Sequence, residues 1–475
     1  MPNENTYPNN PYHFVPLPER GVKRQPAPPH DRFQHLSGSL VVRLRTLSPV
    51  FIGKGGEQGQ DREHQQLLTS AGRPVIPGSS LKGMIRSTFE AVTESCLRLF
   101  QGSYQTRHAN QRYQVPREHL PPTSSETEVR GCQDPAHLCL ACQLFGMVSG
   151  GKNHLAQVAI GEARPEDGRW QPAPGFSIIP LMQPRPHHRA FYVLPPHQKI
   201  GRKFYFHGAQ IQKSNHARKK TLDRVIPAGK TFRFTVTFTN LRQEALDRLV
   251  YSLLLESGMA HRLGQGKPAG LGSIRLQLAE VRLMPDPVAR FQRWQVEERH
   301  LTGEALQAWV AEIYQRLEAW RKSPPLQALR AILHYPDPTS RSYPAPEWFR
   351  THPHTPLAGL PTDLPPSLPA FEDWAEAPAH TPAPPAPGNA PHAPRASPPE
   401  ELPPLEATVT FAPNTQEWQV QFQFDGKSKT AKTKDSTWLG NRLEEIKRQL
   451  DRKSSCQLKV RLQRDGNSFK ILGLA

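Results

Sequence analysis

The chain has 475 residues, which is enough for two or three domains, and its 60 Lys and Arg residues outnumber its 42 Asp and Glu residues. The resulting net charge of +18 favours a polyanionic partner, nucleic acid first and a membrane surface second. No apolar run approaches the ~18 residues that a spanning helix needs. The polar, proline-rich start has no apolar signal-peptide core, and five cysteines argue against a disulfide framework. We therefore expect a cytoplasmic protein without a membrane partner.

The first predicted elements follow an irregular start. Residues 1–36 are rich in proline and predict an extended N-terminal arm. Residues 39–47 alternate apolar and polar side chains, which predicts a strand, and a glycine-rich polar loop follows at 53–61. We expect a helix over residues 79–100. The polar stretch at 101–131 has few apolar anchors and is expected to be an insertion.

The next elements repeat the same order. Strand patterns occur at 158–163, 230–240 and 273–282, a leucine-rich helix pattern occurs at 243–257, and residues 170–224 are irregular and basic. A β-α-β unit followed by a second β-α-β unit is typical of a split ferredoxin-like arrangement. We therefore predict an α+β protein whose core has a ferredoxin-like, RRM-like fold.

The C-terminal part contains three segments of different composition. Residues 287–335 have spaced aromatic and leucine side chains and predict a helical extension. Residues 336–404 are dominated by Pro, Ala and His and predict a disordered linker. Residues 405–475 predict a small basic α+β domain with one helix. Its strand aromatics fit either an RNA-binding surface or a packed core, and they are Trp418, Phe422 and Phe424.

A turn and helix start at residues 77–86 suit a phosphate backbone. Ser79 or Ser80 is the expected N-cap of the helix. Lys82 and Arg86 are four residues apart and so share one helical face. Free N–H groups, hydroxyls and two cations at a helix start favour phosphate contacts.

A glycine-rich loop at residues 264–273 supplies a second candidate phosphate contact. It has four glycines around Lys267. Glycines such as Gly264 and Gly266 allow backbone N–H groups to approach phosphate closely. Neither this loop nor the helix start is a Walker A loop. A structural turn is the alternative for one such loop, but the pair of motifs in a basic chain favours nucleic-acid binding.

A cysteine-rich segment gives the strongest indication of a metal. Cys139 and Cys142 form a CxxC knuckle, and Cys132 lies seven residues before Cys139. Three thiolates supply most of a tetrahedral zinc site. The candidates for the fourth ligand are His137 as the nearest, and Cys96 and His108 as alternatives. Unligated cysteines or a redox pair are the other interpretation, but the loop is polar and short of apolar residues, so we predict a structural Zn²⁺.

Residues 199–224 interleave basic and aromatic side chains. Single-stranded RNA is bound by cations on its phosphates and by aromatic rings stacked on its bases. The first half of the segment contains Arg202, Lys203 and the aromatic run 204–206. The candidate RNA contacts of the second half are Arg218, Lys219, Lys220 and Arg224. A solvated basic face is the alternative interpretation.

These motifs resemble the RAMP superfamily of CRISPR effector proteins, and specifically the backbone subunits of type III complexes. The family's "IPGSSLKG" motif is matched by Ile76–Gly83, and its C-terminal glycine-rich loop is matched by Gly264–Gly272. A Leu-Phe-Gly at 144–146 follows the cysteines, as in some of these subunits. The resemblance covers residues 38–285. It implies a RAMP core at 37–286 that carries a zinc knuckle and a thumb-like insertion.

The resemblance also implies a candidate catalytic residue. RNA-cleaving backbone subunits carry an aspartate in the loop before the motif, and Asp61 lies sixteen residues before Pro77. Such an aspartate supports metal-dependent cleavage of target RNA by the neighbouring 2′-hydroxyl, with a divalent metal such as Mg²⁺. The loop reads Gln-Asp-Arg-Glu-His here, whereas the family has an apolar residue after the aspartate. A solvated loop carboxylate is the alternative.

The sequence thus predicts a subunit that binds CRISPR guide RNA, recognises target RNA and assembles with other RAMP and CRISPR effector subunits. Whether this chain also cleaves RNA is left open. One alternative is a non-catalytic structural or capping RAMP subunit of the same complex. A second alternative is an RNA-binding protein that uses no guide.

Overall fold

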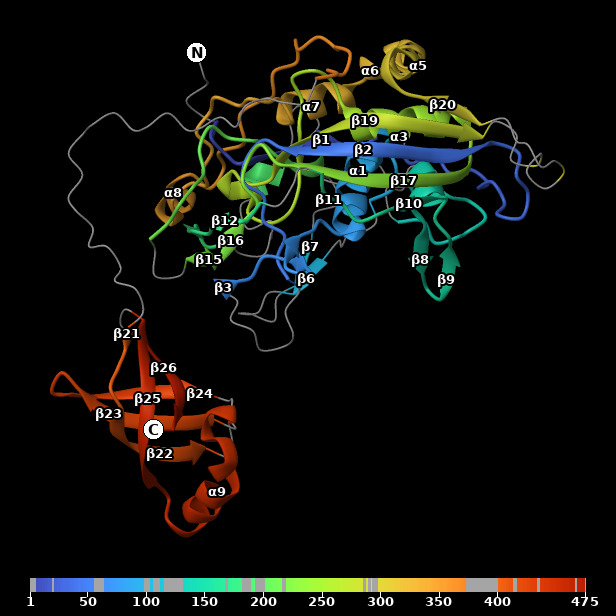
Figure 1. Ribbon diagram of the computed structural model, residues 1–475. Coiled ribbons are helices and arrows are strands. Elements are labelled where there is room, and N and C mark those ends of the chain that lie inside the picture. The colour runs from blue at the N-terminus through green and yellow to red at the C-terminus, as the bar shows by residue number, and fades with distance from the viewer. Residues whose placement is uncertain are drawn as a thin grey trace. The chain divides into compact units, whose positions relative to one another are not determined.

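The computed structural model describes most of the chain. The described residues are 6–18, 21–54, 64–97, 103–105, 112–114, 131–166, 170–181, 189–192, 201–215, 219–284, 288, 292, 298–372, 400–412, 417–433, 436–465 and 468–474. They fall into two compact units, Met1–His380 and Thr381–Ala475 (Figure 1). None of the helices in these ranges combines the length and the apolar character needed to cross a membrane.

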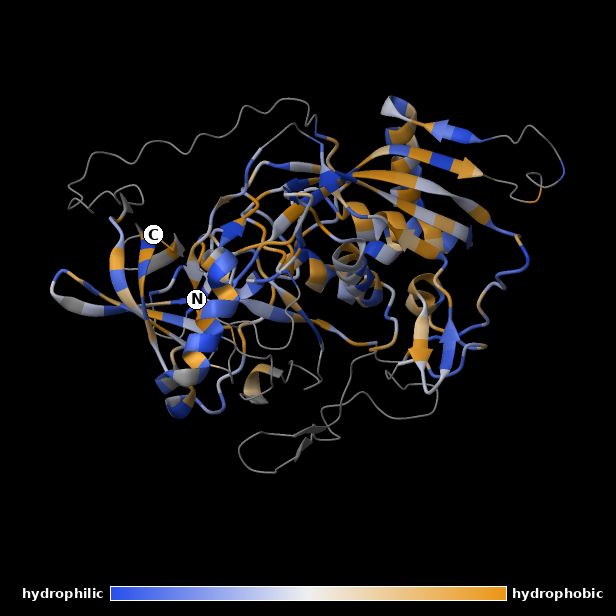
Figure 2. Cartoon of the chain, turned by 60° about the horizontal axis from the view of Figure 1, so that its bottom comes forward, coloured by the Kyte–Doolittle hydropathy of each residue, from blue (hydrophilic) through white to orange (hydrophobic). Residues whose placement is uncertain are grey.

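A central antiparallel sheet organises the first unit. Its strand order is β10-β17-β2-β19-β18, with β11 paired to β17 and β20 paired to β19. These strands are β2 (Leu36–Thr46), β10 (Val158–Ile160), β11 (Arg164–Pro165), β17 (Thr231–Leu241), β18 (His261–Arg262), β19 (Ser273–Met284) and β20 (Arg299–Leu301). Alternate residues of the long strands are buried, as Leu40, Val42 and Leu44 are in β2. Figure 2 shows this alternation as bands of apolar and polar colour along the strands.

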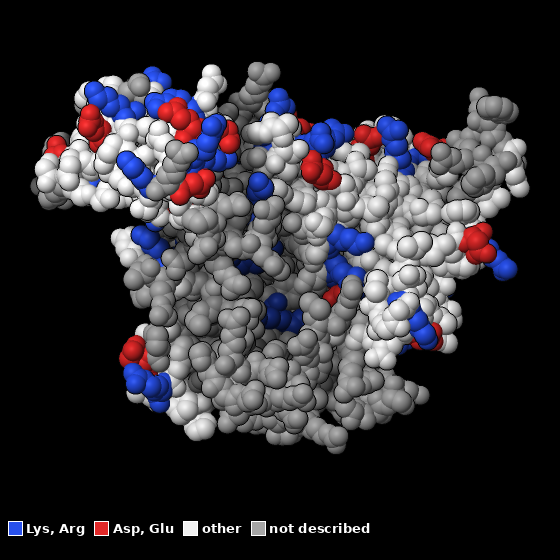
Figure 3. Space-filling model, turned by 90° about the horizontal axis from the view of Figure 1, so that it is seen from below, with Lys and Arg blue, Asp and Glu red and all other residues white. Residues whose placement is uncertain are grey.

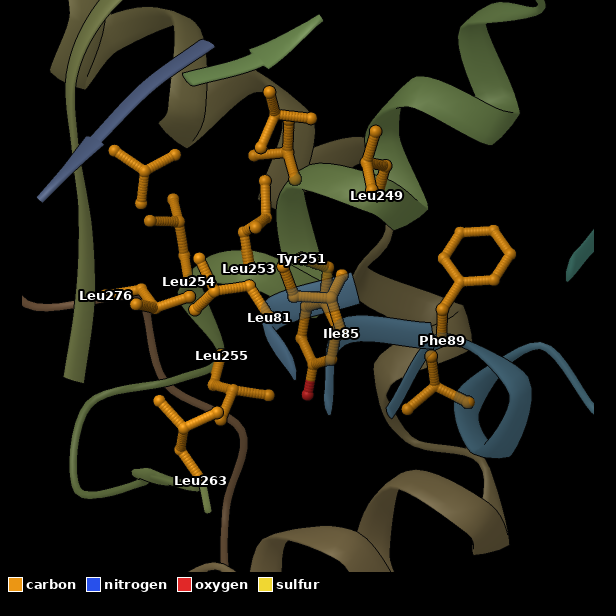
Figure 4. Packing of buried hydrophobic residues seen from close by; sticks show 14 of the residues in the cluster. Leu81, Ile85, Phe89, Leu249, Tyr251, Leu253, Leu254, Leu255, Leu263 and Leu276 are labelled. Carbon is orange, nitrogen blue, oxygen red and sulfur yellow. The ribbon is translucent and has the colours of Figure 1, made fainter. Parts of the chain in front are cut away.

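Two helices supply much of the apolar layer of this unit. They are α1 (Gly78–Val92) and α3 (Gln243–Leu254), which pack against each other, and α3 also packs on β19. Figure 4 shows Leu81, Ile85 and Phe89 of α1 beside leucines of α3 and Tyr251. The sequence predicts an α+β protein, and this unit does combine helices with an antiparallel sheet.

The start of α1 differs in detail from the prediction. The N-cap is Pro77 and no side chain caps the helix, so Ser79 and Ser80 lie in its first turn. Gly78 is required for another reason: a Cβ atom on it would lie 2.1 Å from the carbonyl oxygen of Ile160. The glycine therefore lets the helix start pack directly against the end of β10. The helix ends at Val92 and not at residue 100 as predicted. At this end, the Thr93 hydroxyl donates a hydrogen bond to the Phe89 carbonyl at 2.6 Å.

The N-terminal arm is partly a strand. β1 (Tyr12–Pro16) pairs antiparallel with β14 (Gly201–Tyr205). The aromatic residues Phe204 and Phe206 are buried in the core, and the Arg202 guanidinium is buried beside Glu90 at 3.2 Å. The prediction that the first half of the basic segment offers aromatics to RNA is therefore wrong for Phe204 and Phe206, because these side chains are buried in the core.

The helical extension continues into the stretch that its composition assigned to a linker. Its helices are α5 (Gly303–Arg316), α6 (Glu318–Arg321), α7 (Pro324–Ile332) and α8 (Pro346–Thr351). Glu256, whose side chain is fully buried, pairs with Arg330 at 2.9 Å and with Arg321 at 3.3 Å. The same carboxylate accepts the N–H of Ser367 at 2.9 Å. Residues 336–372 are thus held against the first unit by long-range polar contacts, which proline content does not reveal.

Short elements complete the first unit. They are β3 (His64–Gln65), β4 (Thr69–Ser70), β5 (Arg73–Pro74), β6 (Ser103–Gln105), β7 (Arg112–Gln114), α2 (Leu140–Phe145), β8 (Met147–Ser149), β9 (Lys152–His154), β12 (Ala173–Pro174), β13 (Ser177–Ile178), η2 (Arg189–Tyr192), β15 (Lys220–Leu222), β16 (Arg224–Val225) and η3 (Lys267–Ala269). Of these, β3 pairs in parallel with β15, which also pairs with β13.

The second unit has a six-stranded sheet and its own core. The elements are β21 (Glu400–Glu401), β22 (Leu405–Ala412), β23 (Glu417–Phe424), β24 (Lys427–Thr433), η4 (Thr437–Arg442), α9 (Leu443–Arg452), β25 (Cys456–Asp465) and β26 (Ser468–Leu474). The order is β21-β25-β22-β23-β24, with β26 on β25. Trp418 and Phe422 are buried in this core and Phe424 packs against it, so these aromatics build the core.

Candidate nucleic-acid interface and metal centre

The glycine loop between β18 and β19 adopts a conformation that only glycine tolerates at several positions. Gly264 has a φ of +81°, and a Cβ on it would lie 2.4 Å from the Phe51 carbonyl oxygen. Gly272 has a φ of +88°, and a Cβ on it would lie 2.0 Å from the Leu263 carbonyl oxygen. The glycines therefore let the loop fold back on β18 and on the segment around Phe51.

The protein itself uses most of the loop's N–H groups. Gln265 donates to the Phe51 carbonyl and Gly272 donates to the Pro49 carbonyl, both at 2.9 Å, and residues 269–271 donate to carbonyls of the loop. In the described part of the chain, the N–H groups of Gly264, Gly266 and Lys267 remain without an acceptor. The loop therefore has fewer free donors for phosphate than its glycine content predicts.

A buried cation supports the loop from inside. The Arg262 guanidinium donates to the Ser273 hydroxyl at 2.7 Å and to the Lys267 carbonyl. Burial lowers the pKa of Arg262 to about 9, although Asp337 and Tyr335 oppose this effect. Sequence reasoning missed Arg262, because arginine side chains are mostly exposed to solvent.

Three segments that are far apart in the sequence converge at this loop. Lys220 Nζ donates to the side-chain oxygen of Gln265 at 2.7 Å. The Gln265 side chain also lies against Gly53, where a Cβ atom would be 2.6 Å from Gln265 Nε2. Gly53 and Lys54 begin the loop that carries Asp61, and the Lys54 N–H bonds the Gln66 carbonyl at 2.8 Å, which closes the base of that loop. The basic segment, the glycine loop and the base of the 55–63 loop therefore meet.

The cations of this region are partly desolvated. Burial lowers the pKa of Lys267 to about 8, with a further contribution from the nearby Arg262 charge. Burial also lowers the pKa of Lys220, and the pKa of Lys82 is lowered by burial and then by Arg86. Lys219 is half-buried and Arg224 is exposed. Figure 3 shows Lys and Arg side chains near the middle of the face seen from below, with few Asp or Glu side chains beside them.

Arg86 does not join this basic region as predicted. Its Nε pairs with Glu90 at 2.7 Å, its Nη1 donates to the Gly146 carbonyl at 2.9 Å, and its Nη2 approaches Cys142 Sγ at 3.6 Å. The side chain is therefore committed to the cysteine site and not to a phosphate surface shared with Lys82. Two further predicted residues, Asp61 and Arg218, lie outside the described residues.

Four cysteines form the candidate metal centre. Cys96, Cys132, Cys139 and Cys142 are buried and free, and their Sγ atoms all lie within 4.8 Å of one another. Cys96 Sγ is 3.5 Å from the Sγ atoms of Cys142 and Cys139. Four Zn–S bonds of ~2.3 Å in a tetrahedron place sulfurs ~3.8 Å apart, so this donor set fits one Zn²⁺. A structural metal here would join the end of α1 to the CxxC knuckle.

His137 is not a member of this cluster, which corrects the first choice of fourth ligand. Its ring is exposed, and Nδ1 pairs with Asp134 Oδ2 at 3.1 Å. Cys96 takes the fourth position because the chain after α1 turns back and places Ser95 beside the knuckle, where its hydroxyl accepts the Ala141 N–H at 3.1 Å. The alternative His108 lies outside the described residues.

Charged neighbours match the anionic character of four thiolates. Arg86 approaches Cys142, and Arg202 pairs with the other oxygen of Glu90 and donates to the Ser95 carbonyl. The Cys139 N–H donates to Cys132 Sγ at 3.2 Å, a contact that stabilises a thiolate. Hydrogen bonds from the Cys139, Cys142 and Cys96 thiols hold the pKa of Cys132 well below its usual range. The buried Arg202 and the partly buried Arg86 together with one glutamate leave positive charge next to the sulfurs.

Residues 43–275 match the family model of the RAMP superfamily. The chain belongs to the RAMP superfamily. The matched range begins within β2 and contains β10, β17, β18, the helices α1 and α3, the cysteine cluster and the glycine loop. Its last residue lies in β19, directly after that loop.

Two solved structures are similar to this RAMP protein at low identity. Thermofilum pendens Csc2 is 12% identical, with 61% of this chain and 78% of that chain covered and a TM-score of 0.27. A chain of a type IV-B CRISPR complex is 15% identical, with 51% of this chain and 90% of that chain covered and a TM-score of 0.28. Both TM-scores are low, so the family match alone identifies the chain. No curated protein matches it significantly.

Proposed function

We propose that this RAMP protein is a subunit of a CRISPR effector complex that binds guide RNA along the surface around its glycine loop. The observation that carries the proposal is the contact between Lys220 and Gln265, beside the base of the loop that contains Asp61. Lysines from two motifs thereby reach one surface in a chain of net charge +18. Such a surface suits the evenly spaced phosphates of an extended RNA strand.

The proposed core is a ferredoxin-like unit. The strand order β10-β17-β2-β19, with α1 after β2 and α3 after β17, is the order of an antiparallel β-α-β-β-α-β unit. The glycine loop precedes the last of these strands and the 55–63 loop follows the first. Because β2 and β19 are antiparallel neighbours, the C-terminal end of β2 at Thr46 lies beside Ile274, close to where the glycine loop ends.

The proposed cofactor is one structural Zn²⁺ bound by Cys96, Cys132, Cys139 and Cys142. Its chemistry is to fix four thiolates in one geometry, which would link the chain after α1 to the CxxC segment. Arg86 links this centre to α1, so the metal also holds the helix that carries Lys82.

More specifically, we propose that the protein is a type III backbone subunit that cleaves target RNA. Asp61 is the candidate residue, acting with a divalent metal such as Mg²⁺ on a target RNA. The second candidate function is a non-catalytic structural or capping subunit, which the departure of the Gln-Asp-Arg-Glu-His loop from the family pattern favours.

The test is to purify the protein from its native operon and to sequence the RNA that comes with it. Bound RNAs of one length that share a repeat-derived end, together with other effector subunits, support the proposed function. Bound RNAs of random sequence indicate guide-independent RNA binding. A preparation that contains effector subunits but no RNA indicates that the protein is a structural subunit.

A further inference from the structure

The second unit has the connectivity of a Greek-key barrel. Along the chain, β22, β23 and β24 are followed by η4 and α9 and then by β25 and β26 (Figure 1). The strand β22 pairs with β23 and with β25, β23 pairs with β24, β26 pairs with β25, and β24 contacts β26. Five strands joined in this order form a partly open barrel of the OB type, whose second and third strands present a binding face for oligonucleotides and oligosaccharides. A fold does not assign a ligand, so the chemistry of that face decides.

The inward side chains of this barrel are apolar and form the core of the unit. Trp418, Val420 and Phe422 of β23 are buried in it. Val409 of β22 and Val460 of β25 are fully buried beside them. Because side chains alternate along a strand, the residues between these positions point outward.

The outward side chains are mostly amides, hydroxyls and cations. The outer face, as we define it, comprises Gln419, Gln421 and Gln423 of β23, Lys432 of β24, and Lys459 and Arg461 of β25, which alternate with buried residues of these strands. A hydrogen bond orders the row of glutamines, since Gln421 Nε2 donates to the Ser428 hydroxyl on β24 at 3.0 Å. The outer face thus combines groups that bind base edges with groups that bind phosphates.

The cations of β25 are free to bind an anion. Lys459 and Arg461 are exposed, point to the same side of the strand and form no ion pair with the described residues. Two carboxylates lie on the same side of the barrel. Glu406 is opposite Lys459 in the register without pairing with it, and Glu417 is 3.6 Å from Lys432. The charges of β25 are therefore available to phosphate oxygens.

An exposed aromatic ring adjoins the outer face. Phe411, near the end of β22, is opposite Trp418 in the register, next to Gln419. Its side chain is 36% exposed, and its ring centroid is 4.7 Å from that of Trp418. Unpaired bases stack on such rings, whereas the bases of a duplex are already stacked on one another. The ring therefore favours a single strand over a duplex.

The composition of the outer face favours RNA over a protein partner. Proteins usually bury apolar side chains at the centre of an interface, and the outer face has no apolar member. Residues 405–475 contain 13 Lys and Arg against 8 Asp and Glu. We propose that the outer face binds a segment of single-stranded RNA, with Lys459 and Arg461 on its phosphates, the glutamines on its base edges and Phe411 stacked on one base. This site belongs to a different unit from the glycine loop, and the inference does not depend on guide binding there.

Crosslinking of the full-length protein locates the RNA. The probe is an oligouridylate of about twelve nucleotides that carries 4-thiouridine, since one OB barrel covers roughly 4–16 nucleotides. After irradiation, mass spectrometry identifies the crosslinked peptides, and we expect peptides from β22, β23 and β25 among them. Crosslinks restricted to the first unit overturn the proposal and leave the outer face to a protein partner. Crosslinks restricted to the second unit refute the proposed glycine-loop surface and support this inference.

Charge reversal tests the two cations of β25. Lys459→Glu combined with Arg461→Glu should reduce the crosslinks of the second unit at least about tenfold and leave those of the first unit unchanged, because both phosphate contacts become repulsive. Lys447→Glu combined with Arg448→Glu makes the same charge change on α9 and is the control. All four positions are exposed, so both proteins should keep the melting temperature of the wild type. Equal loss of crosslinks in the two proteins shows an effect of net charge and overturns the proposal.

A duplex competitor separates single-stranded from paired RNA. An unlabelled RNA duplex of the same length should compete for the second-unit crosslinks at least about tenfold less well than the single strand. Phe411→Leu should lower these crosslinks about tenfold, because one stacking contact is lost. A duplex that competes as well as the single strand shows that phosphates alone are recognised, and it overturns the assignment to single-stranded RNA.

Discussion

Lys220 and Gln265, which are 45 residues apart in the sequence, share a hydrogen bond of 2.7 Å between Nζ and Oε1. The contact docks the basic strand β15 onto the glycine loop. β15 in turn pairs with β3, the strand that follows the Asp61 loop. The Gln265 side chain, which is neither a cation nor a glycine, thus connects the three segments that form the proposed RNA-binding surface.

Lys267→Ala should weaken the binding of single-stranded RNA of any sequence and reduce the slope of log affinity against log salt by about one. The reason is that one lysine–phosphate contact releases about one counterion. Fluorescence anisotropy at several salt concentrations gives both quantities. Lys322→Ala is the matched control, because Lys322 pairs with Glu318 on an exposed helix face. If the wild type and Lys267→Ala have equal slopes of log affinity against log salt, the RNA does not contact Lys267.

RNA affinity should also depend on pH through Lys267. Burial lowers the pKa of Lys267 to about 8, so the side chain is charged below that pH and neutral above it. Affinity should therefore fall as the pH rises from 7 to 9 at constant ionic strength. Lys267→Arg keeps its charge in this range and should show a flatter profile. Identical profiles for the two proteins exclude Lys267 as the titrating contact.

The start of α1 and the spacing of the cysteines show which features of the fold can be predicted from local sequence. The period-two strands and the helices α1 and α3 of the first unit follow from short-range pattern, because burial alternates with the period of each element. The contacts of Arg86 with Gly146 and Cys142 cannot be predicted from local sequence, because both residues are distant in the sequence and only the fold brings them to α1. Composition misassigns residues 336–372 for the same reason: their proline content is local, whereas their contacts with Glu256 are not.

The fourth cysteine illustrates the same limit. Three ligands within one segment are recognisable from their spacing, but Cys96 lies after α1 and its place depends on where that helix ends. His137, the nearest residue by sequence, is turned to solvent by Asp134. Sequence distance therefore ranks the candidates in the wrong order, although Cys96 is among them.

Cys96→Ser should lose the bound metal, whereas His137→Ala should keep it. Elemental analysis of the wild type should give about one zinc per chain, since four thiolates make one closed site. The melting temperature of Cys96→Ser should fall, because metal binding stabilises the folded state. Cys456→Ser, in the second unit, is the control for removal of a cysteine outside the cluster. Zinc loss from His137→Ala with retention in Cys96→Ser contradicts the assignment.

Glu256→Gln should destabilise the first unit by roughly 3–5 kcal/mol, because it leaves Arg321 and Arg330 as buried cations without a counter-charge. Burial alone raises the pKa of Glu256, but the Arg330 hydrogen bond and the Ser367 N–H outweigh it and the pKa is lowered. A lowered carboxyl pKa contributes stability above the unfolded-state value, and this stability is lost as the pH falls through the folded value.

Urea unfolding at several pH values measures both effects of Glu256→Gln. The wild type should lose stability on acidification below about pH 4.5 more steeply than the variant, which has no carboxyl group to protonate. Glu318→Gln breaks an exposed pair with Lys322 and should change little. A Glu256→Gln protein as stable as the wild type shows that the network contributes nothing to folding.

Asp61→Ala tests the proposed cleavage. In a complex loaded with guide RNA and Mg²⁺, it should lower the rate of cutting of complementary RNA by at least ~100-fold while leaving guide and target affinity unchanged. A carboxylate that orients a metal or a 2′-hydroxyl acts in the transition state, so its loss affects rate and not binding. Glu57→Ala and Glu63→Ala remove carboxylates from the same loop and should cut normally, and chelation of Mg²⁺ should stop the wild type. Cutting by Asp61→Ala at the wild-type rate moves the chemistry to another residue, and a wild-type complex that binds target without cutting makes this chain a structural subunit.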